Sequence, residues 1–279
     1  MQNFEITIII VAYNPKIKLL EKIIETFHND YPIIITNNSE KKLDLRFYSY
    51  NNVEIIDTLK NKGNGAGINT CLSFCKTKLA LYLDIDAQID RKNLQRLLYY
   101  SKKLKSYGAL IPNNQKDILS DKCKKKIFKR WDVEGSVILL NLENLRNQVL
   151  FDEKIFLYFE ENDFFFNCLK KNINVIYLKD VFISHQRASS INFENNNQLK
   201  QIKCLREWHY MWSSFYFYKK NFGIFYSLKK NLPLFFKDIL RLIYFLISLN
   251  FQSANIRYSR IMGFINSFLN LRSSKRLKQ

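Results

Sequence analysis

The sequence of 279 residues contains few glycines, prolines and histidines, and each shortage excludes a class of protein. Its 7 Gly and 4 Pro argue against a turn-rich, repetitive all-β protein, and no internal repeat is visible. Only three histidines argue against an enzyme with a histidine-based zinc site. Because the segment Met1–Glu5 lacks the basic and apolar regions of a signal peptide, we expect a cytosolic protein.

Cysteines and acidic residues are also scarce. The five cysteines are scattered, which fits reduced and mostly buried thiols in the cytosol: Cys71, Cys75, Cys123, Cys168 and Cys204. The 25 acidic residues face 44 basic ones, giving a net charge of +19. Residues 199–279 carry 15 Lys/Arg and 2 acids, so this tail alone has a charge of +13. A basic, aromatic-rich tail is typical of contact with nucleic acid or an anionic membrane face.

What the sequence does have is a series of short apolar runs separated by loops or helical patterns. The run Ile6–Ala12 is typical of a central parallel strand, and residues 16–29 then show helical spacing. Further strands are predicted at residues 33–35, 53–56, 79–83, 108–111, 133–140, 175–177 and 181–183, with helices at 90–105 and 158–171 and a mobile surface loop at 113–130. This alternation predicts a doubly wound α/β sheet.

The pattern changes at Leu199, where the chain becomes helical, aromatic and basic. We therefore expect two domains, residues 1–198 and residues 199–279. The most apolar stretch, Leu234–Leu249, would reach about 24 Å as a helix, short of the roughly 30 Å of a membrane core. It fits an interfacial helix lying in one leaflet, and it equally fits a helix packed on the first domain or on a dimer partner.

Two carboxylates stand one residue apart directly after the run at residues 79–83. As the ends of parallel strands hold the ligands of open α/β sheets, Asp84 and Asp86 are expected to face a ligand. Hard oxygen ligands suit Mg²⁺ or Mn²⁺, and such a metal usually sits on a substrate diphosphate. An Asp-x-Asp pair alone is weak evidence, so its neighbours along the chain decide its meaning.

Three other features each have a structural and a functional interpretation. The Gly63–Gly67 segment at a helix start is either an anion-binding loop or a simple tight turn. The acids Glu160, Glu161 and Asp163 either complement the dipole of a helix or include a general base. His185 is either an ordinary histidine at a strand end or a third metal ligand.

Taken in order, seven segments form a more specific pattern. They are Ile-Val-Ala-Tyr-Asn, Asn-Asn-Ser, Asn-x-Gly-x-Gly-x-Gly-x-Asn, Leu-Asp-x-Asp, Gly-Ser-Val-Ile-Leu-Leu, Phe-Leu-Tyr-Phe-Glu-Glu-x-Asp and Ile-Ser-His. This set, over about residues 4–190, resembles the family-2 inverting glycosyltransferases of GT-A fold, most of all the rhamnosyltransferase-like branch that builds bacterial surface polysaccharides. Residues 208–223 are similar to the aromatic-basic helix that follows the catalytic domain in that family.

The resemblance implies a GT-A fold with a C-terminal helical extension and a nucleotide-diphosphate sugar donor. It also implies Mg²⁺ or Mn²⁺ as cofactor and a lipid-linked or growing glycan as acceptor. The protein would then be cytoplasmic and peripheral on the inner face of the membrane, where the basic tail would hold it. A homodimer stays open, and no nucleic-acid partner is expected because the basic charge avoids the α/β part of the chain.

The resemblance also assigns roles to matching positions. The donor nucleotide would be held by Ala12, Tyr13, Asn14, Thr36, Asn37, Asn38, Asn61, Gly63, Asn69 and Asp84. The metal would be held by Asp86, His185 and Asp84, and the acceptor site would be formed by Trp131, Gly135 and Asp163. The general base would be Glu160 or Glu161.

Two positions depart from the family pattern. Family members commonly carry Asp where this chain has Thr36, and many carry Glu-Asp where it has Glu160-Glu161. These departures keep open a degenerate transferase that acts as an assembly partner. A nucleic-acid-binding protein that uses the basic tail is a more distant alternative.

Overall fold

The computed structural model describes residues 4–104, 106–114, 127–129, 131–145, 150–186, 190–192 and 196–277. The chain forms two compact units. The first, which we call the sheet unit, comprises Met1–Phe151 and Glu161–Asn192. The second, which we call the helical unit, comprises Asp152–Glu160 and Phe193–Gln279, so a short segment from the middle of the chain belongs with the C-terminal helices.

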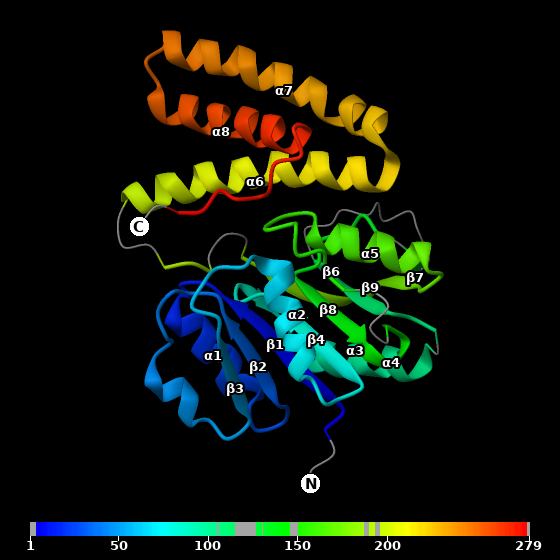
Figure 1. Ribbon diagram of the computed structural model, residues 1–279. Helices are drawn as coiled ribbons and strands as arrows, with labels where there is room; N and C mark the ends of the chain where they lie inside the picture. The colour runs from blue at the N-terminus through cyan, green and yellow to red at the C-terminus, as the bar shows by residue number, and fades with distance from the viewer. Residues whose placement is uncertain are drawn as a thin grey trace. The chain divides into compact units, whose positions relative to one another are not determined.

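The sheet unit begins with four parallel strands, which the apolar runs predicted (Figure 1). They are β1 (Ile6–Ala12), β2 (Ile33–Asn37), β3 (Val53–Asp57) and β4 (Leu79–Leu83), and β1 lies between β2 and β4. Between them lie α1 (Ile17–Phe27), η1 (Leu45–Ser49) and α2 (Asn64–Phe74). Apart from Thr7, β1 is apolar, because both faces of the sheet are covered there and all of its residues except Val11 are buried.

The second half of the sheet is mixed. Its elements are β5 (Ala87–Gln88), α3 (Arg91–Lys103), β6 (Ala109–Asn114), β7 (Ile127–Lys129), β8 (Val137–Asn141), α4 (Leu142–Leu145), α5 (Glu160–Lys170) and β9 (Val175–His185). Within the described residues the strand order is β3-β2-β1-β4-β8-β6-β9-β5, and β7 pairs with β9. β8 runs antiparallel to β4, whereas β9 runs parallel to β6.

Two predictions for this half were wrong. The two strands expected at residues 175–177 and 181–183 are one strand, β9, because a register shift against β6 between Pro112 and Asn113 accommodates the polar residues between them. Of the loop expected at residues 113–130, the described part belongs to strands β6 and β7. Residues 115–126 and 130 of that predicted loop lie outside the described part of the chain.

Close packing explains one of the glycines in the Gly63–Gly67 segment. Gly63 precedes α2 with a positive φ of 98°, which favours glycine. Gly67 lies within α2, where a Cβ atom would stand 2.6 Å from Cγ1 of Val11 in β1. The last glycine therefore lets α2 approach the central strand closely.

The helical unit contains α6 (Asn196–Phe222), α7 (Ile224–Ile247) and α8 (Phe251–Phe268), which pack against one another (Figure 1). Met211, Phe215 and Phe264 form its small apolar core. Of the apolar stretch Leu234–Leu249, the residues up to Ile247 belong to the longer α7, which has 24 residues, and Leu249 lies beyond the helix. None of the described helices combines the length and the apolarity that crossing a bilayer demands.

Candidate active site

The carboxyl ends of β1, β2, β3 and β4 share one edge of the sheet. In the strand register Ala12 lies beside Asn37, and Asn37 lies beside Asp57. Asp84 follows the last residue of β4 at the same edge, since β4 runs parallel to β1. Most of the predicted donor-binding residues are therefore gathered where open α/β sheets bind their ligands.

The loop after β1 is tied to the loop after β2. The carbonyl of Ala12 accepts a hydrogen bond from the amide of Asn38 at 2.7 Å. Asn14 adopts the left-handed conformation (φ 41°), which asparagine tolerates, and its amide donates to Ser39 Oγ at 2.8 Å. Burial raises the pKa of Tyr13, although a side-chain hydrogen bond with Asn61 opposes the shift.

The three residues at the end of β2 hold the surrounding loops. Asn37 donates to Oδ1 of Asp57 at 2.6 Å, and Asn38 donates to the carbonyl of Gly63 at 2.9 Å. The buried hydroxyl of Thr36 donates to the carbonyl of Gly67 at 3.0 Å. Thr36 therefore contributes to the packing of α2 on the sheet through its side chain.

Two further predicted donor residues also have structural contacts. Asn61 accepts a hydrogen bond from the amide of Gly63 at 3.0 Å, which shapes the turn into α2. Asn69 donates to the carbonyl of Phe151 at 2.9 Å and accepts from its amide at 3.0 Å. The amide of Asn69 thus fastens the backbone of residue 151 to α2.

The turn that carries Asp84 and Asp86 is anchored on both sides. The amide of Asp84 donates to the carbonyl of Ser136 at 2.9 Å, next to β8. The short strand β5 pairs antiparallel with the end of β9, where Ala87 lies opposite His185. Ile85, between the two aspartates, is buried in the core. The pairing of β5 with β9 brings Asp86 next to His185.

Asp84, Asp86 and His185 form a compact group of potential metal ligands. One ligand atom from each lies within 4.8 Å of the others. His185 Nε2 lies 3.1 Å from Asp86 Oδ1, and its other ring nitrogen, Nδ1, lies 2.9 Å from Glu134 Oε1. Two carboxylate oxygens and one imidazole nitrogen are donors that fit a divalent cation such as Mn²⁺.

The charges in this group perturb one another strongly. Burial lowers the pKa of His185, but its hydrogen bonds to Asp86 and Glu134 outweigh burial and raise the pKa to about 10. Burial raises the pKa of Asp84 to about 7; the hydrogen bond from Tyr82 opposes this shift, and the Asp86 charge adds to it. Perturbed groups of this kind concentrate at functional sites.

Of the predicted catalytic acids, Glu161 has clear contacts with the site. A Cβ atom placed on Gly135 would stand 3.0 Å from Glu161 Cβ, so the glycine leaves room for this side chain. The Glu161 charge also helps to raise the pKa of Asp84, which places Glu161 within electrostatic reach of the metal-ligand group. Glu160 is buried at the first position of α5.

The remaining acceptor-site predictions lie on or beside α5. Asp163 is completely buried and accepts a hydrogen bond from Asn167 at 2.9 Å, one turn later in the helix. The Trp131 ring packs edge-on against Phe166, with the ring centres 5.3 Å apart. The carbonyl of Trp131 accepts a hydrogen bond from Asn162 at 3.2 Å, so α5 holds this segment in place.

Sequence reasoning missed two residues of the site. Glu134 contacts His185, and its other carboxylate oxygen accepts a hydrogen bond from Asn114 at 3.3 Å. An acid inside the apolar segment 133–140 was the available signal. The Tyr82 hydroxyl donates to Asp84, and its position two residues before Asp84, on the same side of an extended chain, could have indicated this contact.

Comparison with known proteins identifies the family. Residues 7–159, more than half of the chain, match the model of glycosyl transferase family 2, so the chain belongs to that family. No curated protein matches the sequence.

Solved structures show the same fold at low sequence identity. TarS residues 1–349 from S. aureus is 12% identical, with a TM-score of 0.51, over 96% of this chain and 92% of that one. The mannosyltransferase PcManGT from Pyrobaculum calidifontis, solved with GDP-Man and Mn²⁺, is 10% identical, with a TM-score of 0.58, over 97% of this chain and 88% of that one. TarS 1–349 with UDP-GlcNAc is 12% identical, with a TM-score of 0.52, over 96% and 93% of the two chains. These likenesses confirm the predicted GT-A fold.

Proposed function

We propose that this family-2 glycosyltransferase moves a sugar, with rhamnose as the sequence-based candidate, from a nucleotide-diphosphate donor to a glycan hydroxyl with inversion. One observation carries the proposal: Asp84, Asp86 and His185 converge at the carboxyl edge of the sheet, within electrostatic reach of Glu161. A cation site and a nearby carboxylate are the two elements that such a transfer requires. The TarS and PcManGT complexes, which contain UDP-GlcNAc and GDP-Man, support a nucleotide-sugar donor.

The donor nucleotide would lie along the ends of β1 and β2. Tyr13 and Asn14 would border the base and ribose on one side, and Asn37 and Asn38 would do so on the other. Thr36 would shape the donor site indirectly, because its hydroxyl donates a hydrogen bond to the carbonyl of Gly67 in α2. Without a carboxylate at that position, base selectivity would depend on backbone and amide groups.

Asp86 and His185, together with Asp84, would hold Mn²⁺ or Mg²⁺. The imidazole nitrogen favours Mn²⁺, since Mg²⁺ prefers oxygen ligands. A cation bound there would stabilise the negative charge that develops on the diphosphate leaving group. The anchored turn around Ile85 and the β5–β9 pairing would keep these side chains in position.

Glu161 would act as the general base. It would take the proton of the acceptor hydroxyl while the acceptor oxygen bonds to the anomeric carbon and the bond from that carbon to the diphosphate oxygen breaks. Attack from the face opposite the leaving group inverts the anomeric centre without a covalent intermediate. Trp131 and Gly135 would border the acceptor, and Asp163 would stabilise α5 through Asn167.

We further propose that the acceptor is lipid-linked or a growing surface glycan, and that the protein works at the cytoplasmic face of the membrane. The charge of +13 on residues 199–279 supports this location, because each near-surface cation adds about 1 kcal/mol of attraction to an anionic leaflet.

A second candidate, a degenerate transferase that serves as an assembly partner, is favoured by one observation. The position where relatives commonly carry Asp is occupied by Thr36, whose hydroxyl is bonded inside the sheet unit. Such a protein would keep the fold and lose donor binding.

A thermal-shift screen with nucleotide sugars and Mn²⁺ distinguishes the two candidates. A ligand that binds the native state and not the unfolded one raises the melting temperature, and the rise grows with the logarithm of the ligand concentration above its Kd. We expect at least one UDP-, dTDP- or GDP-sugar to raise the melting temperature of the wild type, and Asp86→Asn to abolish the Mn²⁺-dependent part of the shift. A wild type that responds to no donor would support the degenerate transferase.

A further inference from the structure

Helix α7 packs apolar residues such as Leu228 and Phe235 on the core of the helical unit, yet its fully buried side chains are polar and it exposes large apolar ones. Its buried side chains are the polar Ser227, Asn231 and Asp238. Large apolar side chains on the same helix are exposed instead, including Phe236 at 58%, Leu240 at 69% and Ile247 at 78%. Helices of soluble proteins normally turn their apolar face to the core. The exposed apolar side of α7 therefore requires an explanation, as do the polar groups that it buries.

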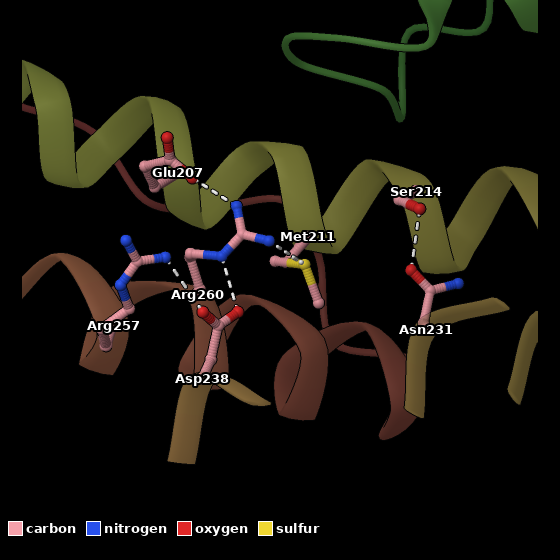
Figure 2. Close-up of polar contacts among 7 residues, drawn as sticks. All are labelled: Glu207, Met211, Ser214, Asn231, Asp238, Arg257 and Arg260. Atoms are coloured by element: carbon pink, nitrogen blue, oxygen red, sulfur yellow. Dashed lines mark hydrogen bonds and ion pairs between the residues drawn. The ribbon is translucent and has the colours of Figure 1, made fainter. Parts of the chain in front are cut away.

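The inner face of α7 is fixed by hydrogen bonds to α6. Ser227 donates to the carbonyl of Phe215 at 2.8 Å, and Ser214 donates to Asn231 Oδ1 at 2.7 Å. Figure 2 shows the Ser214–Asn231 contact bridging the two helices. Because these groups are buried, breaking the contacts to rotate α7 would leave polar atoms without partners.

An ion-pair network holds the same face further along. Arg257 and Arg260 of α8 contact the two carboxylate oxygens of Asp238, at 3.1 Å and 2.6 Å. Arg260 also pairs with Glu207 of α6, so three helices meet at this network (Figure 2). Asp238 is 2% exposed and is the only acid in α7. The polar contacts thus fix the rotation of α7 and leave its apolar side chains facing outward.

The outward side chains form a continuous stripe, which we call the α7 outer face: Phe236, Leu240, Ile243, Tyr244 and Ile247. Their spacing of i, i+4, i+7, i+8 and i+11 places them on one side of a helix. All five are at least half exposed. The exposed Leu249, in the turn to α8, and the exposed Phe251, the first residue of α8, extend the apolar surface beyond the end of α7.

Positive charge borders this stripe. Lys230, Lys237 and Arg241 are exposed and follow one another at i, i+7 and i+11, so they line one edge of the α7 outer face. Since the only acid in α7 is buried and paired, no carboxylate of α7 offsets these charges at the surface. An apolar stripe with a cationic border fits a partner that has an apolar interior and a negatively charged outer layer.

We propose that the α7 outer face binds an anionic phospholipid surface, with the helix lying in the plane of the headgroups. An amphipathic helix of this kind buries its apolar side by about 5–10 Å while its cations meet the headgroups. From Phe236 to Ile247 the α7 outer face extends about 17 Å along the helix axis. The inference deepens the proposed function, since it brings the enzyme to the leaflet of a lipid-linked acceptor. It does not require donor turnover.

Vesicle flotation of the full chain tests the proposal without any sugar donor. We expect the wild type to float with phosphatidylcholine vesicles containing phosphatidylglycerol and to bind pure phosphatidylcholine more weakly. The triple exchange Phe236→Gln, Leu240→Gln and Ile247→Gln should lower the partition coefficient at least about tenfold, because apolar side chains drive the insertion. A wild type that does not float, or a triple variant that floats like the wild type, would overturn the proposal.

A matched control uses exposed apolar side chains of the sheet unit. Leu45, Tyr99 and Leu150 are 79%, 58% and 52% exposed, and their triple exchange to Gln should leave flotation unchanged. Unchanged thermal melting of both triple variants would show that all of the proteins remain folded. Equal loss of flotation in the control would also contradict the assignment to α7.

The cationic border has its own test. Exchange of Lys230, Lys237 and Arg241 to Gln should lower binding to anionic vesicles by about fivefold for each charge. The same exchange of the exposed Lys18, Lys76 and Lys92 should have no such effect. Raising the salt from about 0.1 M to about 1 M shortens the Debye length from about 10 Å to about 3 Å and should weaken the binding of the wild type.

The alternative occupant is a second copy of this chain. Light scattering of the wild type and of the α7 triple variant reveals it. A wild-type dimer that the α7 exchange converts to a monomer, together with absence of flotation, would assign the face to a dimer interface and overturn the membrane proposal. A failed donor screen with intact flotation would overturn only the proposed catalytic function.

Discussion

Glu134 Oε1 lies 2.9 Å from Nδ1 of His185, while Nε2 of the same ring faces Asp86 at 3.1 Å. A carboxylate at Nδ1 keeps the proton on that nitrogen and leaves the lone pair of Nε2 for a cation. Carboxylates in this position orient histidine ligands and raise their basicity. Glu134 thus acts on the proposed metal site through His185.

The first prediction concerns Glu134. We expect Glu134→Ala to weaken Mn²⁺ binding about 10–100-fold without donor present, as measured by electron paramagnetic resonance titration of free Mn²⁺. The Mn²⁺ affinity of Glu134→Gln should lie between those of the wild type and Glu134→Ala, because the amide oxygen of Gln can still accept a hydrogen bond from Nδ1 of His185. Glu143→Ala, which removes an exposed acid paired with Lys78, is the control and should bind Mn²⁺ like the wild type. Unchanged Mn²⁺ affinity in Glu134→Ala would remove this role.

The second prediction separates the two candidate bases. Glu161→Gln should lower kcat by about 10²–10⁴ and leave donor affinity nearly unchanged, because the base acts on the acceptor hydroxyl. Glu160→Gln should reduce kcat much less, unless it unfolds α5, which circular dichroism would reveal. The opposite ranking of the two variants would assign the base to Glu160.

The third prediction uses pH. His209 is fully buried in the helical unit, and burial lowers its pKa to about 3. The unfolded imidazole takes up a proton near pH 6.5, so stability is full above that pH. As the pH falls from about 6.5 towards about 3, the unfolded state binds a proton that the folded state excludes. The contribution of His209 to the free energy of unfolding should then drop by up to about 1.4 kcal/mol per pH unit.

Urea unfolding at several pH values measures this effect through Trp208 and Trp212, which lie in the helical unit. Asp84, whose pKa is raised to about 7, gives the opposite slope in this window, but it does so equally in the wild type and in His209→Gln. The difference in unfolding free energy between the two proteins therefore isolates His209, and the advantage of the wild type should shrink as the pH falls from about 6.5 to about 5. A difference that does not change with pH in this window would contradict a neutral, buried His209.

The fourth prediction concerns the ion-pair network of the helical unit. Asp238→Ala removes the carboxylate between Arg257 and Arg260 and should cost about 3–5 kcal/mol of unfolding free energy, because it strands buried charge. Glu207→Ala should cost less, since the Glu207 side chain is 39% exposed and its loss leaves Arg260 paired with Asp238. Urea unfolding curves of the two variants provide the comparison. Equal costs would show that Asp238 is not the centre of the network.

Several parts of the fold were predictable because local pattern alone determines them. The continuous apolar runs of β1 and β4 identified central strands, and the Asp84–Asp86 pair directly followed one of them. The convergence of His185 on that pair depends on the antiparallel pairing of β5 with β9, nearly one hundred residues apart. Its place at a strand end left His185 open as an ordinary histidine or a third metal ligand, and the family resemblance favoured the ligand.

Other features could not be predicted because they also depend on contacts between residues that lie far apart in the sequence. Glu134 is informative only once His185 lies beside it, and β9 was divided in the prediction because its bulge resembles a turn in sequence. The apolar content of α7 fitted an interfacial helix and a packed helix equally, because the sequence does not show which face is buried. The contacts of Asp238 and Asn231 with neighbouring helices decide that orientation.

The most direct test of the central claim is Mn²⁺-dependent release of nucleotide diphosphate from the donor selected by the thermal-shift screen. Asp86→Asn is nearly isosteric and removes one charge from the proposed metal site. The account predicts that the wild type turns over with Mn²⁺ and stops with EDTA, and that Asp86→Asn loses at least about a hundredfold in kcat/KM while keeping its melting temperature. Equal turnover by wild type and Asp86→Asn, or turnover indifferent to EDTA, would contradict it.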